Sequence, residues 1–401
     1  MNKVTFKLPE HLIFCKRCVM SNYRPASLPE FLHTSDRNNA NYLNINSEGI
    51  CDACMHNENK SKIDWEEREK QLLILLDKHR KNNGDYDCIV PGSGGEDSIY
   101  QSHILKNKYG MNPLTITWPP ILYTDYGYKN FLNWINVGGF DNITFRPNGL
   151  VHKKLTKLAI LNLLHPFQTF ILGQKNLAPK IANKFGINLI FYGENEAEYG
   201  NPIADNSSSL RDNSFYTFKN FSNLKIAGKS IKELNELHQI NLKDLGIYLP
   251  MRSEEIKNGN IEVHYLGYYL KWIPQEAYYY AVKNCDFKPR PFRSEGTYSK
   301  YNSIDHKIDD LHYYTTYIKF GLGRASYDSS QEIRNGHLNR SEAINLVKAY
   351  DGEYPKRYLS EVLEYLDISE QEFTDTCDKF RHSKLWDHNN GSWVLKKSIY
   401  D

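Results

Sequence analysis

The sequence predicts an α/β fold: a doubly wound parallel sheet, an N-terminal region with paired cysteines and a largely helical C-terminal part. Two observations predict the sheet. Short apolar segments alternate with segments of helical pattern between residues 86 and 192, which is typical of parallel strands joined by right-handed crossovers. A glycine-rich turn follows the first strand, as is common where a doubly wound sheet binds its ligand.

The first strand is expected at residues 86–91, and the next helix at 99–109, where Gly110 ends it. Further strands are expected at 114–118, 142–146 and 188–192, and helices at 130–137 and 167–185. Because ligands bind beyond the carboxyl ends of such strands, we expect the residues that follow them to share one crevice. These residues are the turn at 92–98, Thr117, Trp118, Arg146, Gly193 and Glu194. Glu194 is either a second metal ligand, a hydrogen-bond partner or a solvated loop acid.

The turn at residues 92–98 has the composition of an anion site. Its glycines are Gly92, Gly94 and Gly95. Glycine lets the backbone come close to a phosphate, and the N–H groups at the start of the next helix supply positive potential. The hydroxyl groups of Ser93 and Ser98 can donate further hydrogen bonds. Asp97 cannot itself favour a phosphate, so we interpret it as a ligand of Mg²⁺.

Four of the seven cysteines form two C-x-x-C pairs. The pairs are Cys15 with Cys18 and Cys51 with Cys54. Four thiolates suit a tetrahedral Zn²⁺ site and leave no open coordination position, so we expect a structural zinc; an iron–sulfur cluster is the alternative. A redox pair would need a helix that starts directly after a strand, and neither pair is expected in that context.

Charge and hydropathy exclude several classes of protein. Lys and Arg number 50 against 48 Asp and Glu, for a net charge of +2, which does not favour a dedicated nucleic-acid binder. The longest apolar runs, such as residues 158–164, are too short to span a membrane. Residues 1–10 lack the apolar stretch of a secretory signal. We therefore expect a cytoplasmic protein without a membrane partner, in a compartment where disulfides are rare.

The turn resembles the S-G-G-x-D-S signature of the PP-loop ATP pyrophosphatases, in residues 93–98. The resemblance implies a PP-loop, adenine nucleotide α-hydrolase-like fold, with ATP and Mg²⁺ as cofactors. It also implies that the loop holds the pyrophosphate that leaves when ATP is cut between its α and β phosphates. Ser93, Asp97 and Ser98 would then be catalytic. The residues expected to contact ATP are Gly92, Ser93, Gly94, Gly95, Asp97, Ser98, Thr117, Trp118, Gly193 and Glu194.

Five blocks of the C-terminal half are similar to bacterial N-acetyl sugar amidotransferases. They are residues 293–305, 312–321, 323–325, 331–336 and 351–355. Together with the cysteine pairs, the likeness covers nearly the whole chain. Glu96 departs from the family pattern, which has Lys there in many relatives. Because this loop position varies among PP-loop enzymes, the departure concerns how the properties of the loop are tuned and not the class of enzyme.

The second resemblance implies an ATP-dependent conversion of a sugar acetamido group to an acetamidino group, through an adenylated imidate. The settings it implies are pseudaminic acid, legionaminic acid and lipopolysaccharide O-antigen biosynthesis, with an N-acetylated sugar as substrate. Ammonia would come from a separate class I glutaminase subunit. Cys88, Cys285 and Cys377 lack the sequence neighbours of a glutaminase nucleophile, and residue 2 is Asn rather than Cys.

Polar residues of the C-terminal half are candidates for substrate contacts. Lys and Arg side chains can bind a carboxylate or a phosphate, and Lys300 is also a candidate catalytic residue. For each, the alternative is a solvated side chain or a weak surface ion pair. The candidates are Lys271, at the end of a strand expected at 264–270, and Tyr298, Lys300, Asp305, Lys319, Arg324 and Arg334. Helices expected at 341–349 and 358–380 would serve packing.

We expect three regions: a zinc-binding region at 1–66, a PP-loop ATP pyrophosphatase domain at 67–290 and a mainly helical substrate-binding or packing region at 291–401. Two other functions stay open. A tRNA-modifying PP-loop enzyme of the thiolase or lysidine synthase type would need a basic surface, and a thiolase would need a catalytic cysteine near the loop. A zinc-knuckle binding protein with an inactive nucleotide fold is disfavoured by the intact loop.

Overall fold

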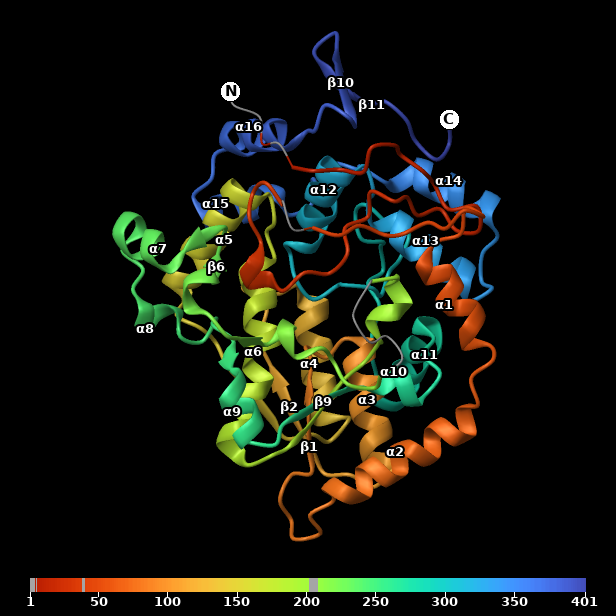
Figure 1. Cartoon of the computed structure of the whole chain (residues 1–401), viewed down its shortest axis with the longest axis vertical. Coiled ribbons are helices and arrows are strands. Elements are labelled where there is room, and N and C mark those ends of the chain that lie inside the picture. The colour runs from red at the N-terminus through yellow and green to blue at the C-terminus, as the bar shows by residue number, and fades with distance from the viewer. Residues whose placement is uncertain (1–3, 5, 38–39, 202–207) are drawn as a thin grey trace.

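The computed structural model describes residues 4, 6–37, 40–201 and 208–401. A sheet of five parallel strands lies in the lower half of the molecule as Figure 1 shows it, in the order β3-β2-β1-β4-β9. The strands are β1 (Cys88–Pro91), β2 (Pro113–Thr117), β3 (Asn142–Thr144), β4 (Leu189–Tyr192) and β9 (Glu262–Tyr265). The predicted doubly wound sheet is thus confirmed. Successive strands are added on one side of β1 as far as β3, and β4 and β9 are then added on the other side. Doubly wound sheets bind ligands at the point where the order of strands reverses in this way.

Side chains of β1 alternate between two hydrophobic cores. Cys88 and Val90 pack with α2 (Trp65–His79) and α3 (Glu96–Asn107) on one face. Ile89 packs with α5 (Gly149–Leu163) and α6 (Gln168–Phe185) on the other face. This alternation follows from the two-residue period of a strand, and a parallel sheet is stable only when helices cover both of its faces.

Beyond the sheet the chain is mainly helical. The other α-helices are α1 (Asp52–Lys60), α4 (Asp125–Asn136), α7 (Ile231–His238), α8 (Leu242–Leu245), α9 (Ser253–Asn258), α10 (Leu266–Tyr269), α11 (Pro274–Cys285), α12 (Asp309–Phe320), α13 (Arg324–Arg334), α14 (Arg340–Tyr350), α15 (Leu359–Leu366) and α16 (Glu370–Phe380). The 3₁₀ turns are η1 (Glu30–Leu32), η2 (Glu196–Tyr199), η3 (Asn213–Phe215) and η4 (Phe221–Asn223). Three two-stranded pairs complete the structure: β5 (Thr217–Phe218) with β8 (Met251–Arg252), β6 (Lys225–Ile226) with β7 (Lys229–Ser230), and β10 (Trp386–Asn389) with β11 (Ser392–Leu395).

One local prediction is wrong. The strand expected at 264–270 is instead the end of β9 followed by the helix α10, so Lys271 follows a helix. A short apolar run does not distinguish a strand from a buried helix by periodicity alone. The second cysteine pair begins α1, with Cys51 as its N-cap, but that helix does not follow a strand. The helices expected near 341–349 and 358–380 are confirmed as α14, α15 and α16.

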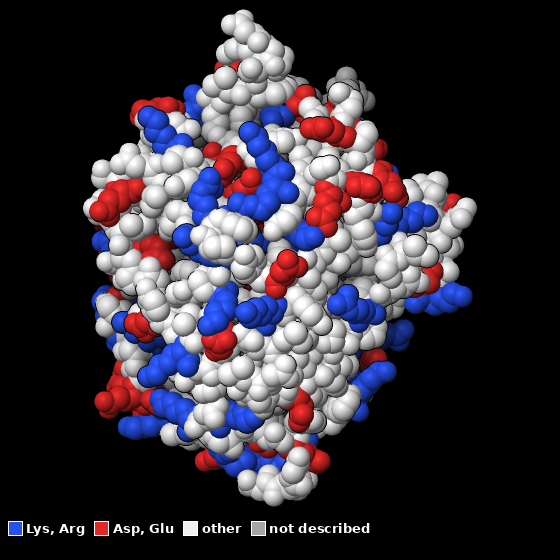
Figure 2. Space-filling view, turned by 180° about the vertical axis from the view of Figure 1, so that it is seen from behind, with Lys and Arg blue, Asp and Glu red and all other residues white. Residues whose placement is uncertain are grey.

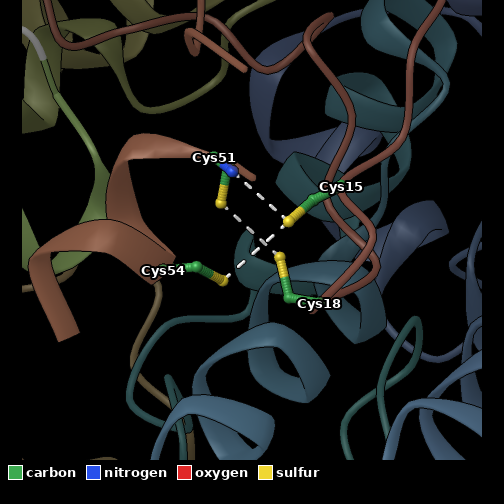
Figure 3. A group of neighbouring side chains, drawn as sticks. All are labelled: Cys15, Cys18, Cys51 and Cys54. Carbon is green, nitrogen blue, oxygen red and sulfur yellow. Dashed lines mark hydrogen bonds between the residues drawn. The ribbon is translucent and has the colours of Figure 1, made fainter. Parts of the chain in front are cut away.

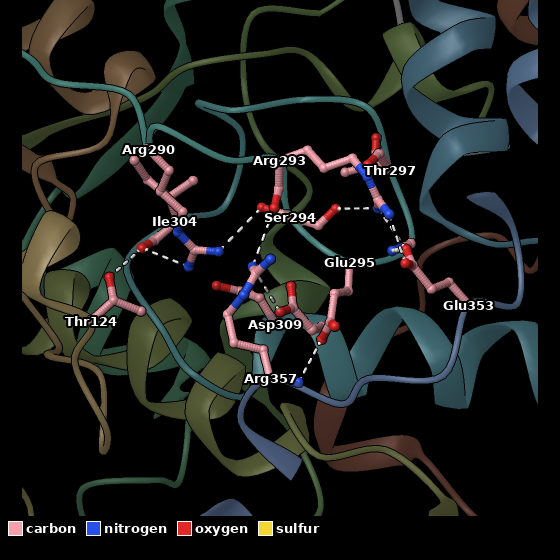
Figure 4. Close-up of polar contacts among 12 residues, drawn as sticks. Thr124, Arg290, Arg293, Ser294, Glu295, Thr297, Ile304, Asp309, Glu353 and Arg357 are labelled. Carbon is pink, nitrogen blue, oxygen red and sulfur yellow. Dashed lines mark hydrogen bonds and ion pairs between the residues drawn. The ribbon is translucent and has the colours of Figure 1, made fainter. Parts of the chain in front are cut away.

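The segment before α12 is fastened to the rest of the molecule by arginines (Figure 4). Arg293 donates two hydrogen bonds to the carboxylate of Glu353, at 2.6 and 2.7 Å. Arg290 is fully buried and donates to the carbonyl of Ile304 at 3.0 Å. The same carbonyl accepts the hydroxyl of Thr124, the N-cap of α4. The contact with Thr124 holds the C-terminal segment against the start of α4.

The N-terminal segment packs among C-terminal helices. The amide of Val4 donates to the carbonyl of Lys379 in α16, and the ring of Phe6 meets the edge of Phe320 in α12 at a centroid distance of 5.9 Å. Both chain ends therefore lie near the same end of the molecule (Figure 1).

Lys and Arg side chains are interspersed with Asp and Glu on the face shown in Figure 2. That face carries no large area of a single charge, in keeping with the small net charge. Within the described part of the chain, no helix has both the length and the apolar character that crossing a bilayer would require.

Candidate active site

A cavity of about 510 Å³ opens beyond the carboxyl ends of β1 and β4. Two of the parts of the chain that line it face each other with polar groups. One wall, the loop wall, consists of residues 91–98 and 193–194. The opposite wall, the C-terminal wall, includes Tyr301, Asp305, Asp309, His312, Tyr313, Arg324, Asp328 and Gln331. The volume lies within the range of small-molecule sites.

The glycine-rich turn keeps its shape by close backbone packing. Gly94 has φ +85°, and a Cβ at that position would lie 2.5 Å from the Cα of Phe131 in α4. Only glycine fits such a position without strain. The hydroxyl of Ser98 donates to the carbonyl of Gly95 at 2.9 Å and accepts from the amide of Gly94 at 3.2 Å. Ser98 therefore holds the loop together, and Gly95 begins α3 with no side-chain cap on its first turn.

Acidic side chains gather at the start of α3. Burial raises the pKa of Glu96 to about 8. Burial, together with the charges of Glu194 and Glu96, raises the pKa of Asp97 well above its usual value. Atom Oδ1 of Asp97 is buried and accepts no hydrogen bond from the described residues. Carboxylates that repel one another in a cleft are typical of a site completed by a cation.

A further acid of the cavity, Glu194, follows the end of β4. Glu194 accepts a hydrogen bond from the hydroxyl of Tyr199 in η2, and burial raises the pKa of Glu194. Among the described residues, the acids of the cavity do not bring three oxygens within 4.8 Å of one another. Mg²⁺ needs no such cage, because it commonly takes one or two carboxylates and completes its shell with water and substrate phosphates. Asp97 and Glu194 fit that kind of site.

Arg324 is the central cation of the C-terminal wall. It lies in the first turn of α13, whose start is fixed by Asp351: the carboxylate of Asp351 accepts the amides of Gly323 at 2.9 Å and Ser326 at 3.1 Å. The Nε of Arg324 donates to Asp328 one turn later, at 2.7 Å. No hydrogen bond joins its Nη atoms to any described residue, so they remain available to a ligand in the cavity.

Asp305 joins the two walls. A Cβ at Gly127, in the first turn of α4, would lie 2.2 Å from the Cα of Asp305, and the amide of Thr124 donates to the carbonyl of Asp305 at 3.0 Å. Burial raises the pKa of the Asp305 carboxyl, and a hydrogen bond with Ser93 partly offsets this. Ser93 thus lies at the junction of the loop wall and the C-terminal wall.

The four paired cysteines form one buried cluster (Figure 3). Their sulfur atoms all lie within 4.8 Å of one another. The Sγ of Cys15 is 4.0 Å from that of Cys54, and the Sγ of Cys18 is 3.7 Å from that of Cys51. The two pairs, far apart in the sequence, therefore converge on one point, as a shared metal would require.

The structure brings only some of the predicted site residues to the cavity. Those that line it are Gly92, Ser93, Gly94, Gly95, Asp97, Ser98, Gly193, Glu194, Asp305 and Arg324. Those that do not line it are Thr117, Trp118, Arg146, Lys271, Tyr298, Lys300, Lys319 and Arg334. Trp118 packs instead against Phe145 and Tyr248 in the core. Lys300 is exposed, and its backbone carbonyl accepts from Arg290.

Sequence reasoning missed several residues of the cavity. Asp328 lies four residues after Arg324, and an Arg-to-Asp spacing of four on one helix face is a signal that could have indicated the pair. His312 and Asp309 lie on the first turn of α12 and face the cavity. Tyr199 carries no local sequence signal, because its contact with Glu194 arises from the turn η2.

Comparisons with known proteins bear on the C-terminal wall. Residues 295–400 match the family described as "LPS biosynthesis protein WbpG-like, C-terminal domain". This segment contains His312, Arg324 and Asp328. The match supports a role in lipopolysaccharide, and hence sugar, biosynthesis.

Two further proteins are similar to parts of the chain. An uncharacterized protein, MJ1599, of Methanocaldococcus jannaschii is 36% identical over 74 residues, which are 18% of this chain and 26% of that protein. The match thus spans about a quarter of that relative's length. The U34-tRNA thiolase NcsA from Methanococcus maripaludis, solved with its [4Fe-4S] cluster, has 10% identity and a TM-score of 0.28, over 88% of this chain and 95% of that one. A similarity of that size carries nothing about the activity of this chain.

Proposed function

We propose that the protein is an ATP-dependent amidotransferase of surface-glycan biosynthesis, which converts an acetamido group of a sugar to an acetamidino group. One observation carries the proposal: the cavity joins a phosphate-type loop to a wall drawn from the segment that matches LPS biosynthesis proteins. The loop supports an enzyme that uses ATP, and the opposite wall supports a sugar as the second substrate. The regions proposed for these roles are residues 67–290 and 291–401.

The loop wall suits the triphosphate. Backbone amides at an uncapped helix start attract anions, and Gly94 lets the backbone reach them. Asp97 and Glu194 would hold Mg²⁺, which neutralises charge on the phosphates when it is bound. The free oxygen of Asp97 and the raised pKa values of the cavity acids support this assignment.

The C-terminal wall suits a polar, hydroxylated substrate. Arg324 presents unpaired Nη donors, and Arg forks bind carboxylates and phosphates in a bidentate manner. The sugar acids that the resemblance implies carry a carboxylate. Asp328 keeps Arg324 in place at 2.7 Å, and the hydroxyl of Thr297 donates to the other oxygen of Asp328 at 2.5 Å. We assign Arg324 to substrate binding and omit Lys300, which is exposed.

The proposed reaction proceeds in two balanced steps. The oxygen of the substrate amide attacks the α-phosphorus of ATP, so that an imidoyl adenylate forms and pyrophosphate leaves. Ammonia then attacks the imidoyl carbon, the bond from carbon to oxygen breaks, and AMP departs with the former amide oxygen. The protein contributes by aligning the reactants and by placing donors where charge develops.

The cysteines support an external source of ammonia. Cys88, Cys285 and Cys377 are buried, and none of the described cysteines lines the cavity. Burial raises the pKa of Cys285 to about 11 and that of Cys377 to about 12. A glutaminase nucleophile needs the opposite environment, which favours the thiolate. We therefore propose a partner glutaminase subunit as the source.

The cysteine cluster favours a single zinc ion. A tetrahedron with metal–sulfur bonds of about 2.3 Å has edges of about 3.8 Å. The distances of 3.7 and 4.0 Å between sulfurs match these edges. An iron–sulfur cluster places several irons among the four sulfurs and needs a wider cage. We propose that this zinc is structural.

Mass spectrometry tests the reaction. The protein is incubated with ATP, Mg²⁺, isotopically labelled ammonium and a panel of acetamido sugars that includes a nonulosonic acid. We expect labelled nitrogen in the sugar, pyrophosphate in equal amount, and the amide oxygen in AMP when that oxygen is labelled. Release of ADP and phosphate, or pyrophosphate release that needs tRNA and leaves every sugar unchanged, would refute the proposal.

A further inference from the structure

A second group of metal-ligating side chains lies outside the cavity and the cysteine cluster. Glu30 belongs to η1, His33 follows η1 directly, and His165 lies in the link between α5 and α6. One ligand atom from each of the three lies within 4.8 Å of the other two. The Oε2 of Glu30 is 3.6 Å from Nδ1 of His33 and 3.5 Å from Nε2 of His165.

These distances match the edges of a metal coordination polyhedron. Zn²⁺ binds nitrogen and carboxylate oxygen at about 2.0–2.2 Å, so the ligands of a tetrahedral ion lie about 3.3–3.6 Å apart. A neutral hydrogen bond between the same groups would be shorter, at about 2.7–3.2 Å. The observed spacing of 3.5–3.6 Å fits groups that share an ion.

The cluster is buried and leaves polar atoms unpaired. Glu30 is 6% exposed and His165 is 8% exposed. The Oε2 of Glu30, the Nε2 of His33 and the Nδ1 of His165 are buried and find no hydrogen-bond partner among the described residues. Burying polar atoms without partners is unfavourable. An ion bound between the side chains would satisfy Oε2 of Glu30 and would bind Nδ1 of His33 and Nε2 of His165, the ring nitrogens that face that oxygen.

The backbone of both segments is fixed, so the ligands are held in place before an ion binds. The side-chain amide of Gln168 donates to the carbonyl of Glu30 at 2.8 Å and ties η1 to the start of α6. Leu164 ends α5 in the left-handed conformation, with φ +46°, so the chain leaves the helix before His165. Such preorganisation is expected of a binding site rather than of a chance contact.

A small void lies beside the two histidine rings. It measures about 10 Å³ and is lined by His33, His165, Thr34, Ser35, Arg37 and Lys319 among others, but not by Glu30. This is room for about one water molecule.

We propose that Glu30, His33 and His165 bind a divalent transition metal of the zinc class. The ring of His165 stacks on His312 at a centroid distance of 5.4 Å, and His312 lines the cavity. The site thus lies directly behind the C-terminal wall. It stands on the geometry of this cluster and is independent of the reaction proposed above.

Nearby cations set its strength. The Nζ of Lys175 is 3.9 Å from the other oxygen of Glu30, and Lys319 and Arg37 line the void. These charges oppose a metal ion, so the site binds more weakly than four thiolates. A chelator should therefore remove its metal before the metal of the cysteine cluster.

Metal analysis of the full-length protein tests the proposal. We expect His165→Asn and His33→Gln to hold one equivalent of metal less than the wild type, by elemental analysis, while circular dichroism stays unchanged. His152→Asn is the matched control, because His152 is also buried but bonds to Tyr248 at 2.8 Å. Equal metal content in all four proteins would overturn the proposal.

Cobalt gives a second readout that does not require any variant to fold. A chelator first removes the more weakly held metal from wild-type protein, and Co²⁺ is then added while the cysteine cluster keeps its own metal. We expect visible d–d absorption without a thiolate-to-cobalt charge-transfer band, because the proposed ligands are nitrogen and oxygen. Absence of such absorption at saturating Co²⁺, or absorption only with the thiolate band, would refute the site. Neither readout depends on ATP or sugar, so the result is separate from that of the proposed function.

Discussion

The two walls of the cavity are built in different ways. The loop wall offers backbone amides, and its shape requires glycine at Gly94, where a Cβ would collide with the backbone of Phe131. The C-terminal wall uses side chains, chiefly Arg324 and Asp328, on a helix whose start is capped by Asp351. Backbone recognition suits a constant group such as a triphosphate, whereas side chains can be exchanged as substrates change. Substitutions in the loop wall should therefore impair ATP binding or turnover, whereas those in the C-terminal wall should impair sugar binding.

The largest effect is expected at the metal-binding acid of the loop wall. If Asp97 holds Mg²⁺ as proposed, Asp97→Ala should lower pyrophosphate release by roughly 100-fold or more, as the loss of several kcal/mol of charge stabilisation implies. Asp125→Ala is the control, since Asp125 is an exposed acid in the first turn of the neighbouring helix α4. Near-normal turnover of Asp97→Ala in a pyrophosphate assay would remove Asp97 from the mechanism.

Backbone shape is tested next. Gly94→Ala places a methyl group 2.5 Å from a backbone atom of Phe131 at positive φ, so the loop must shift. We expect ATP affinity to fall by about 10-fold to 100-fold, which corresponds to about 1.4–2.7 kcal/mol, as measured by calorimetry. Gly149→Ala should leave affinity unchanged, because a Cβ there meets nothing within 4 Å. Equal affinities for both variants would show that the loop does not contact the nucleotide.

Arg324→Lys tests the opposite wall. Lys keeps the charge but loses the bidentate fork, so KM for the sugar should rise by about 10-fold, while ATP affinity changes little. The same helix supplies the control, Arg334→Lys, at its far end and outside the cavity. A change in ATP affinity alone would assign Arg324 to the nucleotide, and the two walls would then not bind separate substrates.

The smallest effect concerns stability and pH. The pKa of Glu96 is raised from 4.5 to about 8 in the folded protein, so the folded state retains a proton that the unfolded state has lost between these values. The contribution of the Glu96 carboxyl to stability is therefore fully present below about pH 4.5 and is lost as pH rises through 8. In thermal melts without nucleotide, Glu96→Gln should flatten this decline relative to wild type, whereas Glu66→Gln, an exposed acid of α2, should not. An unchanged slope would mean that Glu96 titrates normally.

The parts that local sequence determines were predicted well. The strand, the glycine turn and the helix around residues 92–98 are confirmed as elements, because their spacing and residue types act over a few positions. The convergence of the two cysteine pairs was also expected from their ligand count. Side-chain direction was harder to predict: Thr117 and Trp118 do lie at the end of β2, but both are buried and do not line the cavity.

Apart from Asp305 and Arg324, the C-terminal wall was not predicted, because it depends on contacts between distant segments. One such contact joins Thr124 to Ile304, and another joins Tyr123 to His306. Of the basic residues proposed there, only Arg324 lines the cavity; a list of charged positions does not say which helix face turns inward. Glu30 and His165 likewise meet only in the folded chain, since 134 positions separate them (165 − 30 − 1).

The docking of residues 304–307 against the start of α4 has a consequence for biosynthesis. A nascent chain cannot close the pocket until the ribosome has passed α13, even though the nucleotide loop emerges far earlier. An unfinished polypeptide that ends before residue 324 therefore contains the glycine-rich turn but lacks the cation of the opposite wall.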